Sequence, residues 1–143
     1  MLLAQPQEAG PGIPSLYVID WEYAQHGHRA FDLGQMVGDF LERHHFASSP
    51  LAIPMLESFV SGYGPVDEDT AFCTAMHAGA HMLGWFTRRD INGPLPAPLG
   101  VCTEFVEMAV GLLVKGWEGD RNWLEKSAVG CLFEAVEGKS RMK

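Results

Sequence analysis

Residues 16–22 spell L-Y-V-I-D-W-E and residues 31–34 spell F-D-L-G, and the interpretation of the whole chain starts from these two motifs. Leu, Tyr, Val and Ile suit a packed, pleated surface, so residues 16–20 are predicted to form a short buried strand. Side chains two residues apart in a strand project to the same side, which would bring the carboxylates of Asp20 and Glu22 toward one cleft. Such a pair suits Mg²⁺, which prefers oxygen ligands. An acidic turn that only ends a strand has the same sequence, and the residues leave both interpretations open.

The motif I-D-W-E followed by F-D-L-G resembles the aminoglycoside phosphotransferase and choline kinase-like family, in the part that follows the family's catalytic loop. The likeness extends over residues 16–43. It implies that Asp20 matches the metal-binding aspartate, which holds the Mg²⁺ bridging the ATP phosphates. Glu22 is a secondary metal candidate, and Asp32 matches an aspartate that braces the catalytic loop as a structural residue. The cofactors implied are therefore Mg²⁺ and ATP, and the acceptor implied is the hydroxyl group of a small molecule.

The family places a nucleotide-binding lobe and an H-x-D-x-x-x-x-N catalytic loop before this strand. Only fifteen residues precede Leu16, and they contain no Lys, His, Asp or Asn. Phosphoryl transfer needs a carboxylate that orients the acceptor, a cation on the phosphates and a second metal ligand. We therefore expect a C-terminal-lobe fragment of such a kinase, without a complete catalytic set and inactive alone. The alternative is a non-catalytic helical remnant or protein-interaction module, which would associate with itself or a partner chain at the surface left by the missing lobe.

The composition narrows the class of protein. The net charge is −8, from 18 acidic and 10 basic residues, which argues against nucleic-acid binding because phosphate contacts need clustered Lys and Arg. No apolar run reaches the roughly 18 residues needed to span a membrane. The three cysteines, Cys73, Cys102 and Cys131, are far apart and form no C-x-x-C pair, which is typical of a reducing compartment. We expect a cytoplasmic protein.

Apolar periodicity predicts a mainly α fold, a bundle of about five helices with one short N-terminal β element, similar to the C-terminal lobe of a kinase-like phosphotransferase. The predicted helices cover about residues 32–45, 51–63, 67–87, 99–118 and 121–136. The helix at 99–118 is strongly apolar, and its apolar spread suggests the centre of the bundle. Residues 1–15 are predicted to be a flexible lead-in without an element of its own, 16–138 a partial kinase-like lobe, and 139–143 a basic tail. The strand at 16–20 is then expected to be an unpaired edge.

Several side chains receive specific predictions. Asp32 with Gln35 resembles a capping box that starts the first helix. The apolar pattern places Met36, Met55 and Trp123 inward. His26 and His28 are expected in a solvated loop.

His77 and His81 share a helix face four residues apart, which is a chelating geometry. However, Ala78 stands where the metalloprotease motif H-E-x-x-H needs Glu. Packed helix histidines are therefore preferred over a zinc site.

Overall fold

The fold is mainly α, as predicted, in a computed structural model that describes residues 2–3, 16–17, 24, 26–90, 92–134 and 136. Within those residues there are six helices and two short strands. Their bounds are β1 Leu2–Leu3, β2 Leu16–Tyr17, α1 Arg29–Ala47, α2 Ala52–Tyr63, α3 Glu68–Thr87, α4 Leu99–Glu118, α5 Arg121–Glu125 and α6 Cys131–Glu134. None of the described helices is both long and apolar enough to cross a membrane.

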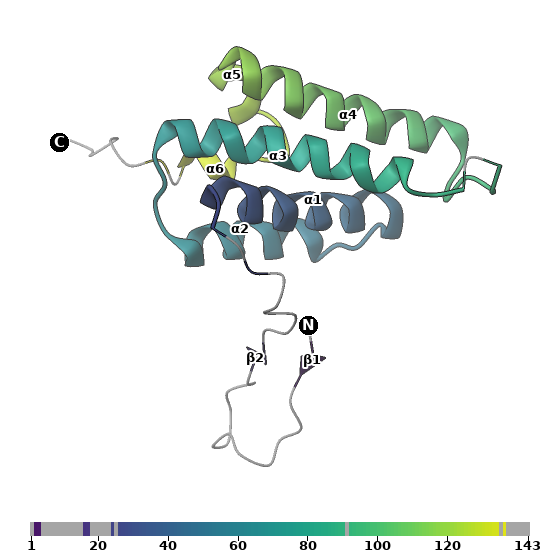
Figure 1. Ribbon diagram of the computed structural model, residues 1–143, viewed down its shortest axis with the longest axis horizontal. Coiled ribbons are helices and arrows are strands. Elements are labelled where there is room, and N and C mark those ends of the chain that lie inside the picture. The colour runs from purple at the N-terminus through teal and green to yellow at the C-terminus, as the bar shows by residue number, and fades with distance from the viewer. Residues whose placement is uncertain are drawn as a thin grey trace.

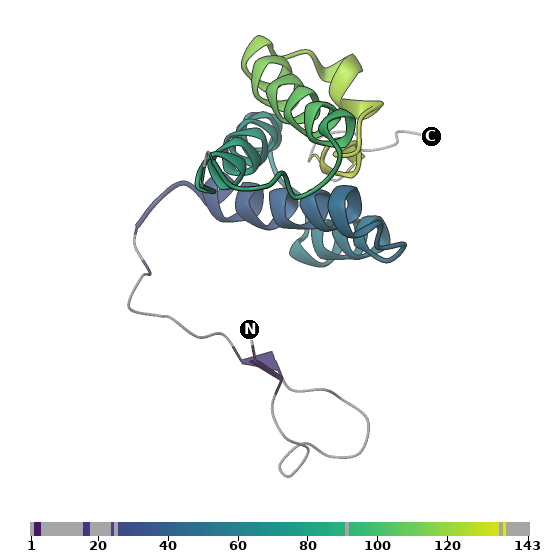
Figure 2. The same ribbon diagram turned by 90° about the vertical axis from the view of Figure 1, so that its right-hand side faces the viewer.

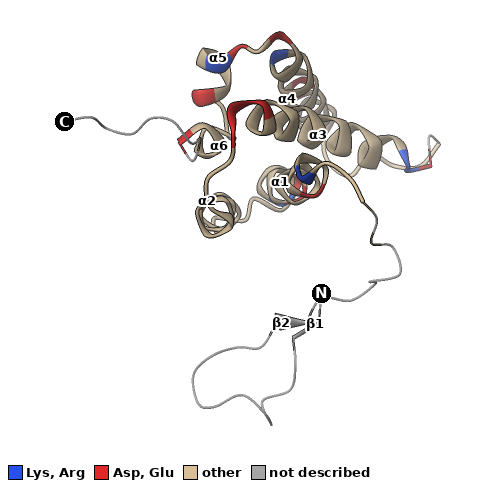
Figure 3. Ribbon diagram, turned by 60° about the vertical axis from the view of Figure 1, so that its left-hand side comes forward, with Lys and Arg blue, Asp and Glu red and all other residues tan. Residues whose placement is uncertain are grey.

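The helices α1, α3 and α4 lie side by side, with α3 between the other two (Figures 1 and 2). α2 packs on α1, and the two short helices α5 and α6 pack on α4 and α2 respectively. The prediction that 99–118 is the central helix is therefore wrong, because α3 holds that position. α3 suits the centre because residues 70–87 contain no Asp, Glu, Lys or Arg, and several of its buried residues are small, namely Ala71, Ala75, Ala78 and Gly79. Figure 3 shows this helix in tan beyond its acidic first turn.

One hydrophobic core joins all the long helices. Its largest fully buried side chains are Phe105, Leu41, Leu56, Met82, Leu112, Leu124 and Leu132. Three residues that periodicity placed inward are not fully covered, since Met36 is 37% exposed, Met55 is 52% exposed and Trp123 is 37% exposed. The periodicity of apolar residues indicates which face of a helix is apolar. It does not indicate how much of that face a neighbouring element covers.

The predicted fifth helix is two helices. α5 ends at Glu125, and the Ser127 hydroxyl donates to the Leu124 carbonyl at 2.7 Å while accepting from the Val129 amide at 3.3 Å. These bonds form a turn that competes with the helical pattern. Gly130 follows, packed against the Glu125 carbonyl, before α6 begins. Val136 forms an isolated parallel β-bridge with Val66.

The N-terminal strand has a partner, contrary to the prediction of an unpaired edge. β1 pairs antiparallel with β2, with Leu2 opposite Tyr17 and Leu3 opposite Leu16. An element therefore lies inside the segment that was expected to be a plain lead-in. Pairing satisfies backbone groups that an isolated strand would leave open. The rest of the predicted strand at 18–20 and the basic tail at 139–143 lie outside the described residues.

Candidate functional site

The structure describes one of the three predicted site residues. Asp20 and Glu22 lie outside the described residues, so the metal-ligand predictions for them stay predictions. Asp32 lies in the first turn of α1 and is exposed. Its carboxylate makes no hydrogen bond or ion pair with any residue that the structure describes.

The cap of α1 is His28 and not Asp32, so the predicted capping box with Gln35 is wrong. His28 has an extended backbone, and its Nδ1 accepts a hydrogen bond from the Ala30 amide at 3.2 Å. The imidazole is thus the N-cap acceptor, which is usually the side chain of Ser, Thr, Asp or Asn. Asp32 instead lies inside the first turn, where a carboxylate is favoured by the partial positive charge of the helix N-terminus. Because α1 starts earlier, Asp32 is held on a formed helix.

The glycine of F-D-L-G explains how α1 is positioned. A Cβ on Gly34 would lie 2.9 Å from both the Ala78 amide nitrogen and the Thr74 carbonyl oxygen, and it would also collide with His77. One turn later, a Cβ on Gly38 would lie 2.8 Å from Cδ2 of His81. Two glycines four residues apart therefore let α1 approach the backbone of α3 closely, as small residues do at tight helix crossings. This contact fixes the face on which Asp32 lies.

A polar contact ties the starts of α1 and α3 together. Asp67 caps α3, accepting from the Thr70 amide at 2.7 Å and from the Thr70 hydroxyl at 2.9 Å. The same carboxylate pairs with the Arg29 guanidinium at 3.0 Å, and Figure 3 shows the acidic start of α3 next to the basic start of α1. The bonds from Thr70, more than the Arg29 pair, lower the pKa of Asp67 from 3.8 to about 2.

We expect Asp67→Ala to lower the melting temperature by about 2–5 °C at pH 7, because it removes the cap of α3 and the partner of Arg29. The folded-state pKa is below the ordinary value, so this stabilisation is present above about pH 4 and is lost as the pH falls toward 2. In melting curves followed by circular dichroism at pH 7, 4, 3 and 2, the melting temperatures of the wild-type protein and of Asp67→Ala should therefore come together as the pH falls. The exposed first-turn residue Asp69, changed to Ala, is the matched control, and an equal loss there would contradict a specific role for Asp67.

The histidines of α3 contact different groups of α1. His77 meets the Phe31 ring edge-on with 5.4 Å between ring centroids, and His81 Nε2 lies 3.0 Å from an Asp39 carboxylate oxygen. Partial burial, followed by the nearby Asp39 charge, raises the pKa of Glu42 beside this pair. In the described part of the chain, no three His, Cys, Asp or Glu side chains are grouped so that they could hold a metal ion. The predicted metal ligands Asp20 and Glu22 lie outside that part.

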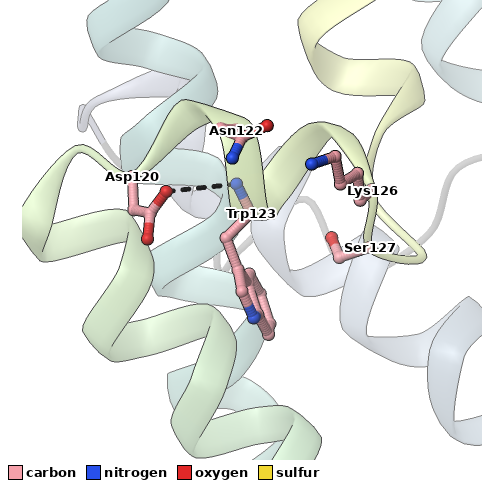
Figure 4. Close-up of a pocket in the computed structure, with 5 residues that line it drawn as sticks. All are labelled: Asp120, Asn122, Trp123, Lys126 and Ser127. Carbon is pink, nitrogen blue, oxygen red and sulfur yellow. Dashed lines mark hydrogen bonds between the residues drawn. The ribbon is translucent and has the colours of Figure 1, made fainter.

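Two further features were missed from the sequence. His45 Nε2 lies 2.7 Å from the Val101 carbonyl, and the His45 ring packs on Phe105. A pocket of about 360 Å³ also lies beside α5. It is lined by Asp120, Asn122, Trp123, Lys126 and Ser127 (Figure 4). All five residues belong to α5 or to the turns on either side of it.

The comparisons with known proteins point to one class of enzyme. The chain is 29% identical over 116 residues to phosphotransferase FrzJ from Cladobotryum sp, a match that covers 81% of this chain and 29% of that protein. It is 25% identical over 87 residues to 4-hydroxytryptamine kinase from Psilocybe cubensis, covering 59% of this chain and 24% of the kinase. This chain is similar to part of two kinase-like phosphotransferases. The chain thus matches less than a third of the length of these curated relatives. No protein-family model matches it, and no solved structure does.

Proposed function

We propose that this chain is a C-terminal-lobe portion of an aminoglycoside phosphotransferase or choline kinase-like enzyme, which transfers the γ-phosphate of ATP to a small-molecule hydroxyl. The observation that carries the proposal is the similarity to a phosphotransferase and a kinase, which extends over 81% of the chain in the first case. One of these relatives is named for a small hydroxylated amine, 4-hydroxytryptamine, which supports a small-molecule acceptor.

Each candidate residue has a proposed part in this function. Asp20 binds Mg²⁺ on the ATP phosphates, and Glu22 is a secondary contact to the metal. Asp32 braces the catalytic loop, which is consistent with a first-turn carboxylate that has no partner among the described residues. Catalysis of phosphoryl transfer depends on positioning and electrostatic stabilisation. The 143 residues contain no H-x-D-x-x-x-x-N motif, so we propose that they do not catalyse transfer by themselves.

The proposal is tested by titrating Mg·ATP into the purified chain in a calorimeter. We expect weak binding that Asp20→Asn reduces at least tenfold, because the variant removes the charged metal ligand while it keeps the size of the side chain. Glu22→Gln should have a smaller effect. Circular dichroism of all three proteins establishes that they are folded. A folded wild-type chain that gives no heat, or equal binding by Asp20→Asn, would refute the assigned metal site.

A second candidate function is that of a non-catalytic helical interaction module. The observation that favours it is the outer face of α4, where Val110, Val114 and Trp117 are 44%, 39% and 79% exposed. Large apolar side chains gathered on one surface are typical of protein-binding sites. Both candidates can hold at once, since a lobe fragment can also bind a partner through a face remote from α1.

A further inference from the structure

The helix α4 has apolar side chains on two faces, and only one of them is covered. The covered face packs on α3 and includes Phe105, Ala109 and Leu112, which are 0–1% exposed. The other face carries Val106, Val110, Val114 and Trp117, spaced four, four and three residues apart, so that they form one stripe along the helix. We call this set the outer stripe. The stripe is about three turns, or roughly 16 Å, long, and among the described elements only Trp123 of α5 lies beside it.

A groove of about 390 Å³ lies alongside the outer stripe. Its lining consists of Val106, Glu107, Val110, Gly111, Val114, Lys115 and Trp123. Trp123 forms the far wall, and its position is fixed from two sides. Its ring lies against Gly111, where a Cβ would be only 3.0 Å from Cη2, and its amide donates to the Asp120 carboxylate at 3.1 Å (Figure 4). The groove is therefore part of the folded structure and not the result of one loosely placed side chain.

The edge of the groove is acidic. Glu107 lines it and Glu104 lies one turn earlier on the same edge, and neither makes an ion pair or hydrogen bond with a described residue. The one cation in the lining, Lys115, is already engaged by Glu118 at 2.7 Å and Asp120 at 3.3 Å. These two bonds raise the pKa of Lys115. The unpaired charge on this edge is thus negative.

We propose that this groove binds an amphipathic helix of a partner protein, with apolar side chains against the outer stripe and Lys or Arg beside Glu104 and Glu107. An open groove along three helical turns matches anchors spaced at i, i+3 or i+4, and i+7. A second copy of this chain fits less well. Two chains that each carry a net charge of −8 repel each other, which disfavours pairing of one α4 with another.

This inference develops the interaction-module candidate and rests on it. It does not depend on Asp20 or on nucleotide, so its failure would leave the phosphotransferase proposal as it is. Light scattering should first give the mass of a monomer. If it gives the mass of a dimer, and if Val110→Asn converts that dimer to a monomer, a second copy of the chain occupies the groove and the inference is overturned. The binding probe is an 18-residue amphipathic helical peptide of Leu and Lys, with the corresponding peptide of Leu and Glu as its charge-reversed control.

Binding is measured by calorimetry at 150 mM salt, so that weak surface attraction is screened. We expect the Leu/Lys peptide to bind and the Leu/Glu peptide not to bind. The double variant Glu104→Gln/Glu107→Gln should weaken binding about tenfold, and Val110→Asn should do the same. The matched variant Glu57→Gln/Glu134→Gln removes two exposed carboxylates from α2 and α6 and should change binding less than twofold. Equal losses in the two double variants, equal binding of the two peptides, or no binding of either would overturn the proposal.

Discussion

The variant Gly34→Ala is expected to lose about 3 kcal/mol of unfolding free energy, although Ala is normally the better helix former. The new Cβ would lie 2.9 Å from two backbone atoms of α3, at Ala78 and Thr74, and would collide with His77. Backbone atoms in a helix cannot rotate away as a flexible side chain can, so α1 and α3 must separate. Separation weakens the buried contacts between them, which include Leu33, Val37 and Ala78. Urea unfolding monitored by circular dichroism measures the loss.

Gly84→Ala is the matched control for this variant. Gly84 lies inside α3, and a Cβ there would meet no atom within 4 Å. The same substitution should therefore stabilise the protein by about 0.5–1 kcal/mol, through helix propensity alone. The two variants are thus predicted to change stability in opposite directions. If Gly34→Ala were as stable as Gly84→Ala, the close approach of α1 to α3 would not exist in solution, and the position assigned to Asp32 would lose its support.

The case of Gly34 also shows which part of the fold could be predicted from the sequence. F-D-L-G and the apolar period of 3.6 residues after it predicted a helix, and this prediction is confirmed by α1. The need for glycine could not be predicted, because the atoms that exclude a Cβ belong to Thr74 and Ala78, which lie about forty residues further along the chain. Local patterns carry information about a helix and its ends, whereas a close approach depends on two distant segments together.

The start of α1 was misplaced for a related reason. Asp32 and Gln35 fit the usual capping pattern, whereas His28, the actual cap, is not one of the residues that pattern contains. The extended backbone of His28 and its contact with the Ala30 amide become visible only in three dimensions. For the site itself, Asp20 and Glu22 were singled out by their spacing in a predicted strand and by the family resemblance, and their roles stay predictions because both lie outside the described residues.

The outer stripe of α4 was also misinterpreted from the sequence. Helix 99–118 was expected to be central because of its apolar spread, yet Trp117 is 79% exposed. Apolar residues on every side indicate that a helix has neighbours on every side, but they do not say whether those neighbours belong to the same chain. In this protein α3 is the main neighbour of α4, and α1 and α5 contact it less extensively. Val110, Val114 and Trp117 of the outer stripe stay exposed among the described elements. The failed prediction therefore points to the proposed docking groove.

Phe105→Ala is expected to destabilise the protein by about 3–5 kcal/mol, a large part of the roughly 5–15 kcal/mol that holds a domain of this size together. Phe105 is 0% exposed, and its ring centroid lies 4.7 Å from that of Phe46 and 5.4 Å from that of His45. Its removal leaves a cavity where α1 meets α4, next to the contact between His45 and Val101. Urea unfolding should show a much lower midpoint, and Phe105→Leu, which fills most of the space, should recover more than half of the loss.

Trp117→Ala provides the contrast on the opposite face of the same helix. Its ring is 79% exposed, so its removal from a monomer should change the unfolding free energy by no more than about 0.5 kcal/mol. A loss comparable to that of Phe105→Ala would mean that the outer stripe is already covered in solution, and a concentration-dependent unfolding midpoint would then identify a second copy as the cover. A small loss, together with the peptide binding proposed above, would mean that α4 uses one apolar face for its own fold and keeps the other for a partner.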